Sequence, residues 1–322
     1  MEKKKPRIIF MGTPELAAHV LRIIIDKGYP VAGVVTAPDK PAGRGKKKRH
    51  SEVKQVALEH ELPLLQPESL KDETFIKSLR VLQPDIQVVV AFRMLPESVW
   101  ALPPTGTFNL HASLLPDYRG AAPINWVIIN GEQRTGVSTF LIDHKIDTGN
   151  ILFRKEIDIA PYETAGTLHE KVKAEGAPLV IQTIEALIDG TVQPKSQEQF
   201  MDEVSQLHKA PKIYKEDCRV RWDKTAQEVA NLIHGLSPRP GAFCDITDVN
   251  DKQVRLKIYE AHPELTPHHF APGTMLTDNR KNIRFATPDG FVHVRQLQLE
   301  GKRRMETEEL LRGTTFPPSQ AC

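Results

Sequence analysis

The first part of the chain carries the pattern that most limits its fold. A continuous apolar run, Arg7–Met11, predicts a strand buried on both faces, as in a parallel sheet. Apolar residues then recur at helical spacing up to Gly28, with Thr13 expected as the N-cap and Pro14 as the first helical residue. Val31–Thr36 predicts a second strand. This strand–helix–strand order is typical of the start of a doubly wound α/β domain.

The same alternation continues through the first half of the chain, interrupted by a long polar loop at 37–51. Further helices are predicted at Glu52–Glu61, Lys71–Leu82, Pro123–Asn130 and Thr164–Ile188. Further strands are predicted at Asp85–Ala91, Thr107–His111, Gly136–Ile142 and Ile151–Ile159. The sequence therefore predicts a Rossmann-like, doubly wound, mostly parallel sheet.

The pattern changes in the second half of the chain. Residues 190–207 are polar and lack a clear period, which indicates a linker. Beyond them one helix is expected, at Ala226–Leu236, among short strands separated by turn residues: Arg219–Trp222, Arg255–Tyr259, Ile283–Ala286 and Phe291–Leu299. We expect a catalytic domain at 1–189, a linker at 190–207 and an OB-like β-barrel domain at 208–322.

Composition excludes several classes of protein. The net charge of +2 is nearly neutral, so binding to a polyanion needs a local basic patch. Cys218, Cys244 and Cys322 are odd in number and widely spaced, which favours neither a disulfide framework nor a cysteine zinc site. No apolar stretch reaches membrane-spanning length, and Ile8–Met11 is too short for a signal-peptide core. We therefore expect a cytoplasmic protein without membrane association or a bound metal, and monomeric by default.

Two polar residues alternate within the predicted strand Thr107–His111. Residues two apart on a strand project to the same face, so Asn109 and His111 are expected side by side. An amide NH₂ beside an imidazole N–H forms a candidate oxyanion site. The pattern also fits a polar strand end whose groups are satisfied by neighbouring loops. Spacing alone leaves both interpretations open.

The segment 112–123 is too rich in proline and glycine for a helix or strand. It leaves the carboxyl end of the strand that holds His111, where open α/β sheets place their ligands. Leu114 and Leu115 in this loop either line an apolar pocket or are buried against a neighbouring helix.

Asp147 follows the predicted strand Gly136–Ile142, just before Gly149. A carboxylate beside a turn glycine commonly caps its own turn. It is also a candidate for orienting an imidazole and relaying a proton. His144 fits a solvated loop position.

The polar loop 37–51 is strongly basic. Against the single acid Asp39 it carries six basic residues: Lys40, Arg44, Lys46, Lys47, Lys48 and Arg49. The run fits a solvated surface, or a clamp on the phosphates of a polyanion. Its length exceeds that of an ordinary strand-to-helix connection, which favours a functional loop.

Together these segments resemble the family of methionyl-tRNA formyltransferases. The resemblance rests on Phe10–Pro14, Pro38–Lys47, Asn109–Pro116, Arg119–Ile124, Gly136-Val137 and Asp147–Gly149. Leu207–Phe243 resembles the start of the family's C-terminal domain, so the resemblance spans nearly the whole chain. The Asn-x-His and Asp set with Ser-Leu-Leu-Pro is specific for folate-dependent formyl transfer. The basic loop and the β-rich second half favour a tRNA acceptor.

The resemblance implies transfer of the formyl group of 10-formyltetrahydrofolate to the α-amine of initiator methionyl-tRNA, for translation initiation. Asn109 and His111 would donate hydrogen bonds to the oxyanion, and Asp147 would orient the imidazole and relay a proton. The residues implied for folate are Phe92, Arg93, Leu95, Ser113, Leu114, Leu115 and Pro116. Those implied for tRNA are Arg44, Lys46, Lys47, Lys48 and Arg49.

Two positions depart from the family pattern. Ala91-Phe92-Arg93 stands where the family commonly has Ala-Tyr-Gly, and Arg239 stands where it often has Trp. Phe92 keeps an aromatic ring near the expected pterin site, and Arg93 adds a charge there.

Three other functions fit parts of the same sequence pattern. The nearest is a folate-dependent formyltransferase that acts on an amino-sugar nucleotide or another small amine. A non-catalytic RNA-binding protein is disfavoured because Asn109, His111 and Asp147 are all present. A nicotinamide-dependent oxidoreductase is disfavoured because Pro14 and Glu15 stand where the phosphate-binding fingerprint needs glycine.

Overall fold

The computed structural model describes residues 5–42, 47–203, 206–249, 251–317 and 319–320. The chain divides into two compact units. The first consists of Met1–Gly120, Gly136–Ile157 and Glu170–Lys209. The second consists of Ala121–Thr135, Asp158–His169 and Ala210–Cys322. No helix in the described ranges is both long and apolar enough to cross a membrane.

The first unit is built on a seven-stranded sheet with the order β10-β9-β7-β6-β1-β2-β5. Its strands are β1 (Ile8–Gly12), β2 (Val31–Val35), β5 (Leu64–Leu65), β6 (Ile86–Val90), β7 (Thr107–His111), β9 (Arg134–Leu141) and β10 (Ile151–Asp158). From β5 to β7 every neighbouring pair is parallel, and β9 joins β7 antiparallel. The strand order reverses at β1, which confirms the predicted Rossmann-like, doubly wound sheet.

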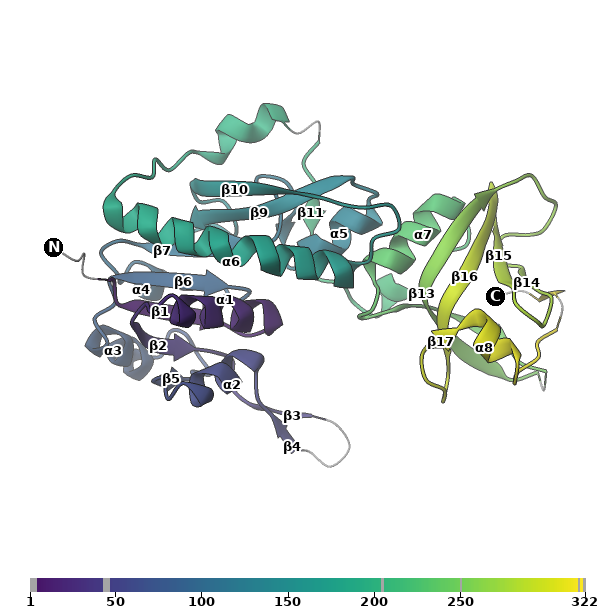
Figure 1. Cartoon of the computed structure of the whole chain (residues 1–322), viewed down its shortest axis with the longest axis horizontal. Coiled ribbons are helices and arrows are strands. Elements are labelled where there is room, and N and C mark those ends of the chain that lie inside the picture. Colours follow the sequence, from purple (N-terminus) through teal and green to yellow (C-terminus); the bar gives the residue numbers. More distant parts are fainter. Residues whose placement is uncertain (1–4, 43–46, 204–205, 250, 318, 321–322) are drawn as a thin grey trace. The chain divides into compact units, whose positions relative to one another are not determined.

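Helices cover this sheet, and Figure 1 shows α1 and α6 along one face. The helices that belong to the unit wholly or in part are α1 (Glu15–Asp26), α2 (Glu52–Glu59), α3 (Glu73–Val81), α4 (Glu97–Trp100) and α6 (Ala165–Asp189). Ile9 and Met11 of β1 share a buried cluster with Phe75 and Leu79 of α3 and Val99 of α4. The apolar run of β1 is thus buried, as predicted.

Two local expectations for this unit were wrong. Helix α1 begins at Glu15, with Pro14 as its N-cap and no side-chain cap, so Thr13 does not cap it. The polar loop is also not irregular throughout, because β3 (Lys40–Ala42) pairs antiparallel with β4 (Lys47–Arg49). Residues 43–46 between them lie outside the described residues.

The base of this hairpin is closed by a polar cluster around Asp39. Its Oδ2 accepts a hydrogen bond from Lys54 Nζ at 2.6 Å, and its Oδ1 accepts one from Gln66 Nε2 at 3.1 Å. His50 Nδ1 lies 3.1 Å from Oδ2. The Lys54 ammonium, the Gln66 amide and the His50 ring hold the pKa of Asp39 well below its usual range. The carboxylate therefore stays ionised and ties both ends of the basic segment together.

The second unit contains an antiparallel half-barrel, with the strand order β12-β13-β16-β15-β14-β18 and β17 beside β16. Its strands are β12 (Ala242–Thr247), β13 (Gln253–Leu265), β14 (Met275–Thr277), β15 (Ile283–Thr287), β16 (Gly290–Leu299), β17 (Met305–Glu306) and β18 (Ser319–Gln320). Its α-helices include α5 (Pro123–Ile129), α7 (Ala226–Gly235) and α8 (Thr307–Leu311). This agrees with the predicted β-rich C-terminal domain.

One predicted strand of this domain was wrong. Residues 219–222 form only an isolated bridge, Arg219 to Phe243. Their apolar residues are nevertheless part of the core, since Val220 and Trp222 are buried and Trp222 stacks on Phe285 at 4.2 Å between ring centroids. The alternation in sequence indicated burial here and not a sheet position.

The remaining short elements among the described residues are β8 (Arg119–Gly120), β11 (Lys209–Ala210) and the 3₁₀ helices η1 (Gln197–Glu203) and η2 (Glu216–Cys218).

A buried histidine lies on α7. His234 is 3% exposed, and its Nε2 accepts a hydrogen bond from the backbone N–H of Ala261 at 3.3 Å. Burial, together with the nearby positive charge of His262, lowers the pKa of His234 to about 4 from an ordinary value of 6.5. The folded unit therefore holds this ring neutral.

We predict that acid weakens the second unit through His234. In the unfolded chain the ring binds a proton near pH 6.5, and in the folded unit only near pH 4. The stability that the neutral ring contributes is therefore complete above pH 6.5 and is lost as the pH falls towards 4, by about 3 kcal/mol. His234→Gln keeps an acceptor for Ala261 but does not titrate. Thermal unfolding of both proteins at pH 7 and pH 4.5 should show a smaller pH effect in the variant, and an equal effect would contradict the prediction.

Candidate active site

The candidate site lies where β7 ends. Asn109 and His111 are the third and last residues of this strand, and the loop 112–118 leaves its carboxyl end. Strand β6 is parallel to β7 and adjacent to it, so the segment 91–95 leaves the same edge of the sheet. The two segments predicted to hold folate thus start from neighbouring strand ends.

The His111 ring is buried and held by one backbone group. Its Nε2 lies 2.9 Å from the carbonyl oxygen of Tyr118. A carbonyl oxygen can only accept, so Nε2 carries a proton and donates it. The other nitrogen, Nδ1, lies 3.9 Å from Oδ2 of Asp147. The neutral ring therefore has its lone pair on Nδ1, on the side of the carboxylate.

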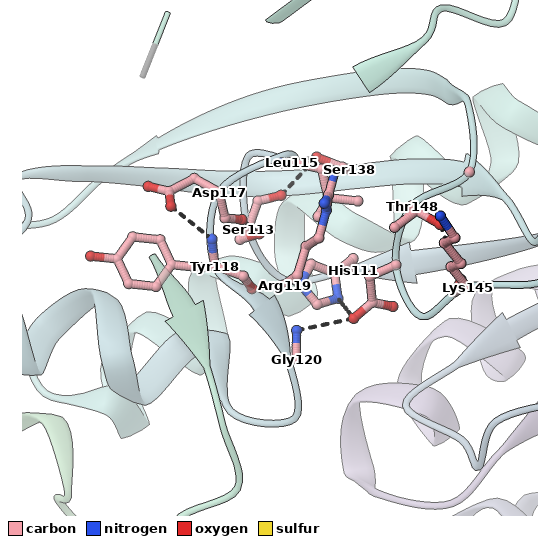
Figure 2. Close-up of polar contacts among 12 residues, drawn as sticks. His111, Ser113, Leu115, Asp117, Tyr118, Arg119, Gly120, Ser138, Lys145 and Thr148 are labelled. Atoms are coloured by element: carbon pink, nitrogen blue, oxygen red, sulfur yellow. Dashed lines mark hydrogen bonds and ion pairs between the residues drawn. The ribbon is translucent and has the colours of Figure 1, made fainter. Parts of the chain in front are cut away.

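Asp147 is held in an uncommon backbone conformation, with φ at +55°. Its Oδ2 accepts a hydrogen bond from the backbone N–H of Gly120 at 3.0 Å (Figure 2). The turn before it is closed by a different acid: Asp143 Oδ1 accepts from Lys145 N and from Thr148 Oγ1, both at 2.9 Å. Asp147 is thus not the cap of its own turn, and its carboxylate is directed to Gly120 and His111.

A close approach explains the glycine beside Asp147. A Cβ atom on Gly149 would lie 1.6 Å from the carbonyl oxygen of Leu141, which no side chain could tolerate. The backbone N–H of Leu141 also donates to the carbonyl oxygen of Asn150 at 2.9 Å. The Asp147 turn is therefore packed directly onto the end of β9.

The Asn109 side chain is half-buried, and its backbone is paired on both sides, with Val89 of β6 and Phe140 of β9. Within the described ranges, no hydrogen bond to its amide group is found. The alternative of a polar strand end satisfied by loops fits His111, whose Nε2 is bonded, better than it fits Asn109. Among the described residues, the Asn109 amide therefore has no partner that would prevent it from donating to a ligand.

The loop after β7 is fixed by buried serines. Ser138 Oγ accepts from Leu115 N at 3.1 Å and donates to Ser113 O at 2.7 Å. Ser113 Oγ in turn donates to Asp117 O at 2.6 Å, and Figure 2 shows these groups around the loop. Leu115 is fully buried in a cluster with Phe140 and Ile151. Leu115 therefore fixes the loop from within the core, and Leu114 is only partly buried.

The segment Phe92–Leu95 is anchored differently. The Arg93 guanidinium lies 5.3 Å from the Phe92 ring centroid and donates to the carbonyl oxygens of Pro67 and Glu68 at 2.8 and 2.9 Å. Leu95 is buried beneath the segment. In the part of the chain that the structure describes, the backbone groups of residues 92–95 have no backbone partners. The Arg93 guanidinium, which departs from the family pattern, is thus bonded to nearby carbonyl groups. The backbone groups of residues 92–95 keep no backbone partner among the described residues.

The predicted tRNA residues are described only in part. Arg44 and Lys46 lie outside the described residues, and of Lys47, Lys48 and Arg49 only the backbone, in β4, is described.

His144, the histidine of the turn that leads to Asp147, has an exposed side chain close to Trp100 and to Glu97, as a solvated loop residue would.

Several groups that shape the site were missed in the sequence. The Tyr118 carbonyl, the Gly120 N–H and the Ser138 hydroxyl act through tertiary contacts, and two of them are backbone groups that no side-chain pattern reports. Ser138 gave a weak signal as a small polar residue within a strand whose central residues are all buried. Gln197, in the predicted linker, gave none, although its amide donates to the Asp147 carbonyl at 2.9 Å.

Comparison with known proteins defines the class. The formyl transferase family matches residues 6–184, and the family's C-terminal domain matches residues 212–315. The chain belongs to the formyl transferase family. The methionyl-tRNA formyltransferase of Bacteroides thetaiotaomicron is 50% identical to it over 97% of this chain and 97% of its own length. That of Flavobacterium johnsoniae is 50% identical over 97% of this chain and 98% of its own length.

Solved structures at low identity share the fold. HypX from Aquifex aeolicus, in complex with tetrahydrofolic acid, matches 98% of this chain with a TM-score of 0.63 and 18% identity; the chain spans 49% of HypX. An N-formyltransferase from Helicobacter canadensis, in complex with folinic acid and dTDP-3-aminofucose, matches 90% of this chain and 98% of its own, with a TM-score of 0.60 and 20% identity.

Proposed function

We propose that this chain transfers the formyl group of 10-formyltetrahydrofolate to the α-amine of initiator methionyl-tRNA. The similarity to two methionyl-tRNA formyltransferases extends over 97% of the chain at 50% identity, so it covers both units. The single structural observation that carries the chemistry is the His111–Asp147 pair at the end of β7, beside an Asn109 amide that has no hydrogen bond among the described residues.

The hydrogen bond to Tyr118 supports a proton-transfer role for one nitrogen of His111 only. Since His111 Nε2 already donates to a carbonyl, only Nδ1 can exchange a proton with substrates. As the amine attacks the formyl carbon, its nitrogen becomes positive, and Nδ1 accepts the proton that it loses. The Asp147 carboxylate, 3.9 Å away, stabilises the charged ring. Nδ1 then returns the proton to the folate nitrogen as the bond from that nitrogen to the formyl carbon breaks.

This sequence of proton transfers gives His111 a more specific role than hydrogen-bond donation to the oxyanion. In its neutral form Nδ1 has no proton to donate to an oxyanion, so Asn109 is the donor available when the attack begins. Once Nδ1 is protonated, its N–H becomes a second donor. The two polar residues of β7 therefore act in sequence, first the amide alone and then the amide with the imidazolium.

The two segments at the strand ends fit the folate donor. Backbone N–H and C=O groups at Phe92–Leu95, which lack backbone partners among the described residues, can bond the edge of a pterin ring. The Phe92 ring and the half-buried Leu114 offer apolar surface. Ser113, Leu115 and Pro116 fix the second segment through buried contacts. We assign these residues and Arg93 to the folate site, most of them as supports of its backbone.

We expect Asn109→Ala and His111→Ala each to lower turnover by about 10²–10³. This is the usual cost of removing one oxyanion donor, as for Asn109, and lies within the range for removing a general acid–base group, as for His111. Folate should still bind, because the segment Phe92–Leu95 is unchanged. The measurement is kcat for formylation of methionyl-tRNA, with folate affinity measured separately by equilibrium binding. Near-normal turnover in either variant would remove that residue from the mechanism.

The acceptor half of the proposal depends on the basic hairpin. The Asp39 cluster holds the base of the segment that carries Arg44, Lys46, Lys47, Lys48 and Arg49. We assign these five to tRNA phosphates, within an overall division into a catalytic domain at 1–189, a linker at 190–207 and a tRNA-binding β-barrel domain at 208–322. We further propose that the protein acts as a cytoplasmic monomer.

Neutralising Arg44, Lys46, Lys47 and Lys48 together should weaken tRNA binding and flatten its salt dependence, because fewer counterions are released. KM for methionyl-tRNA across a salt series measures both effects, with charged initiator and elongator methionyl-tRNAs compared. Lys77→Gln and Lys171→Gln, on the helices α3 and α6, serve as a control for loss of positive charge elsewhere. Unchanged tRNA kinetics would restore the solvated-surface interpretation, and absence of tRNA binding by the unaltered protein would favour a small-amine acceptor.

A further inference from the structure

The segment after α6 does not leave the first unit directly. Lys195 pairs with Ile151 of β10 through two backbone hydrogen bonds, of 2.8 and 2.9 Å. The Phe200 ring packs on the cluster that contains Leu115, and the Arg154 guanidinium lies 4.6 Å from its centroid. Helix η1 is thereby docked against the sheet beside the loop that follows β7.

Gln197, the first residue of η1, is 4% exposed, and both ends of its amide are bonded. Its Nε2 donates to the carbonyl oxygens of Asp147 and Gly149, both at 2.9 Å. Its Oε1 accepts from Arg119 Nε at 3.0 Å and from Arg119 Nη2 at 2.6 Å. The carbonyls can only accept and the guanidinium can only donate, so this orientation of the amide is the one that satisfies all four bonds.

These bonds reach both sides of the Asp147 carboxylate. On one side, two carbonyls of the turn that holds Asp147 at φ +55° are tied to Nε2. On the other, Arg119 is tied to Oε1, and the next residue, Gly120, donates its N–H to Asp147 Oδ2. A non-glycine residue persists in the left-handed backbone conformation only where the surrounding structure holds it there. Gln197 bonds to both of the segments that hold Asp147 in this conformation.

We propose that Gln197 is a positioning residue for formyl transfer, holding the Asp147 carboxylate towards Nδ1 of His111. It acts through Asp147 and touches no substrate. The expected effect on kcat rests on the proposed function, whereas the hydrogen bonds of Gln197 lie within the protein itself. A segment predicted as a linker thus supports the reacting groups.

Two substitutions separate the two ends of the amide. Gln197→Met removes all four bonds at similar volume, and Gln197→Glu keeps an acceptor for Arg119 but places a carboxylate against the carbonyls of Asp147 and Gly149. We expect kcat for formylation to fall about 10²-fold in both, as for a reacting group misplaced by about 1 Å. KM for folate and for methionyl-tRNA should stay near the wild-type values. The matched control is Gln199→Met, an exposed glutamine on the same helix.

A double variant tests whether Gln197 works through Asp147. If it does, Gln197→Met combined with Asp147→Asn lowers kcat no further than Asp147→Asn alone. Full additivity, or an effect of Gln197→Met on KM alone, would overturn the proposal. Thermal unfolding of each variant checks that the fold is intact, and a kcat equal to that of Gln199→Met in a folded variant would also overturn it.

A second measurement does not depend on the acceptor. The ¹⁵N resonances of the His111 ring should move in Gln197→Met and stay in place in Gln199→Met, because only the former displaces the carboxylate next to Nδ1. If the wild-type protein fails to formylate methionyl-tRNA while this shift is seen, the proposed function fails and the positioning role stands. If the resonances are the same in all three proteins, the positioning role fails.

Discussion

The hydrogen bond from His111 Nε2 to the Tyr118 carbonyl is the contact on which the rest of the site depends. An imidazole has two nitrogens of similar basicity, and an unconstrained ring could present either one to a substrate. Here Nε2 keeps its proton and donates it in a hydrogen bond to the Tyr118 carbonyl, so in the proposed mechanism Nδ1 is the nitrogen that exchanges protons. The Asp147 carboxylate lies 3.9 Å from Nδ1, and it can matter for proton transfer only because Nε2 is already bonded.

This contact depends in turn on how the loop after β7 is built. Tyr118 has φ +54°, and its N–H donates to the backbone oxygen of His208 at 3.0 Å. Asp117 Oδ1 accepts from His208 N at 2.6 Å, while Ser113 Oγ donates to the Asp117 carbonyl at the same distance. The loop is therefore held from the sheet side by serines and from the other side by Phe200 and His208. A carbonyl placed by such a network needs no secondary structure of its own.

The repetitive elements were predictable because their cause is local. The alternation of β7 is enough to predict Asn109 and His111 on one face, and the buried run of β1 and the helical period of α1 are enough to predict a doubly wound sheet. Asp147 was not predictable in the same way. Its position results from a left-handed backbone and a bond to Gly120, twenty-seven residues away, and only family resemblance favoured a catalytic role for it over an ordinary turn cap.

The errors have physical causes of the same kind. Residues 219–222 alternate like a strand because alternate side chains are buried, but their backbone makes only one bridge. Thr13 precedes a proline and looks like a cap, yet the helix starts after Pro14. The predicted linker is a different case: its residues Gln197 and Phe200 pack onto the first unit singly, and a single residue has no period to detect.

The arrangement separates the reaction from the choice of acceptor. The groups assigned to the formyl group and its proton lie at one strand end of the first unit, in a fold shared with an N-formyltransferase solved with an amino-sugar nucleotide. In the proposed mechanism Asn109, His111 and Asp147 meet only the attacking nitrogen and the formyl group, so they do not distinguish one primary amine from another. Selection must therefore come from parts that reach beyond the reacting atoms, and the basic hairpin closed by Asp39 has the charge that a polyanionic acceptor requires.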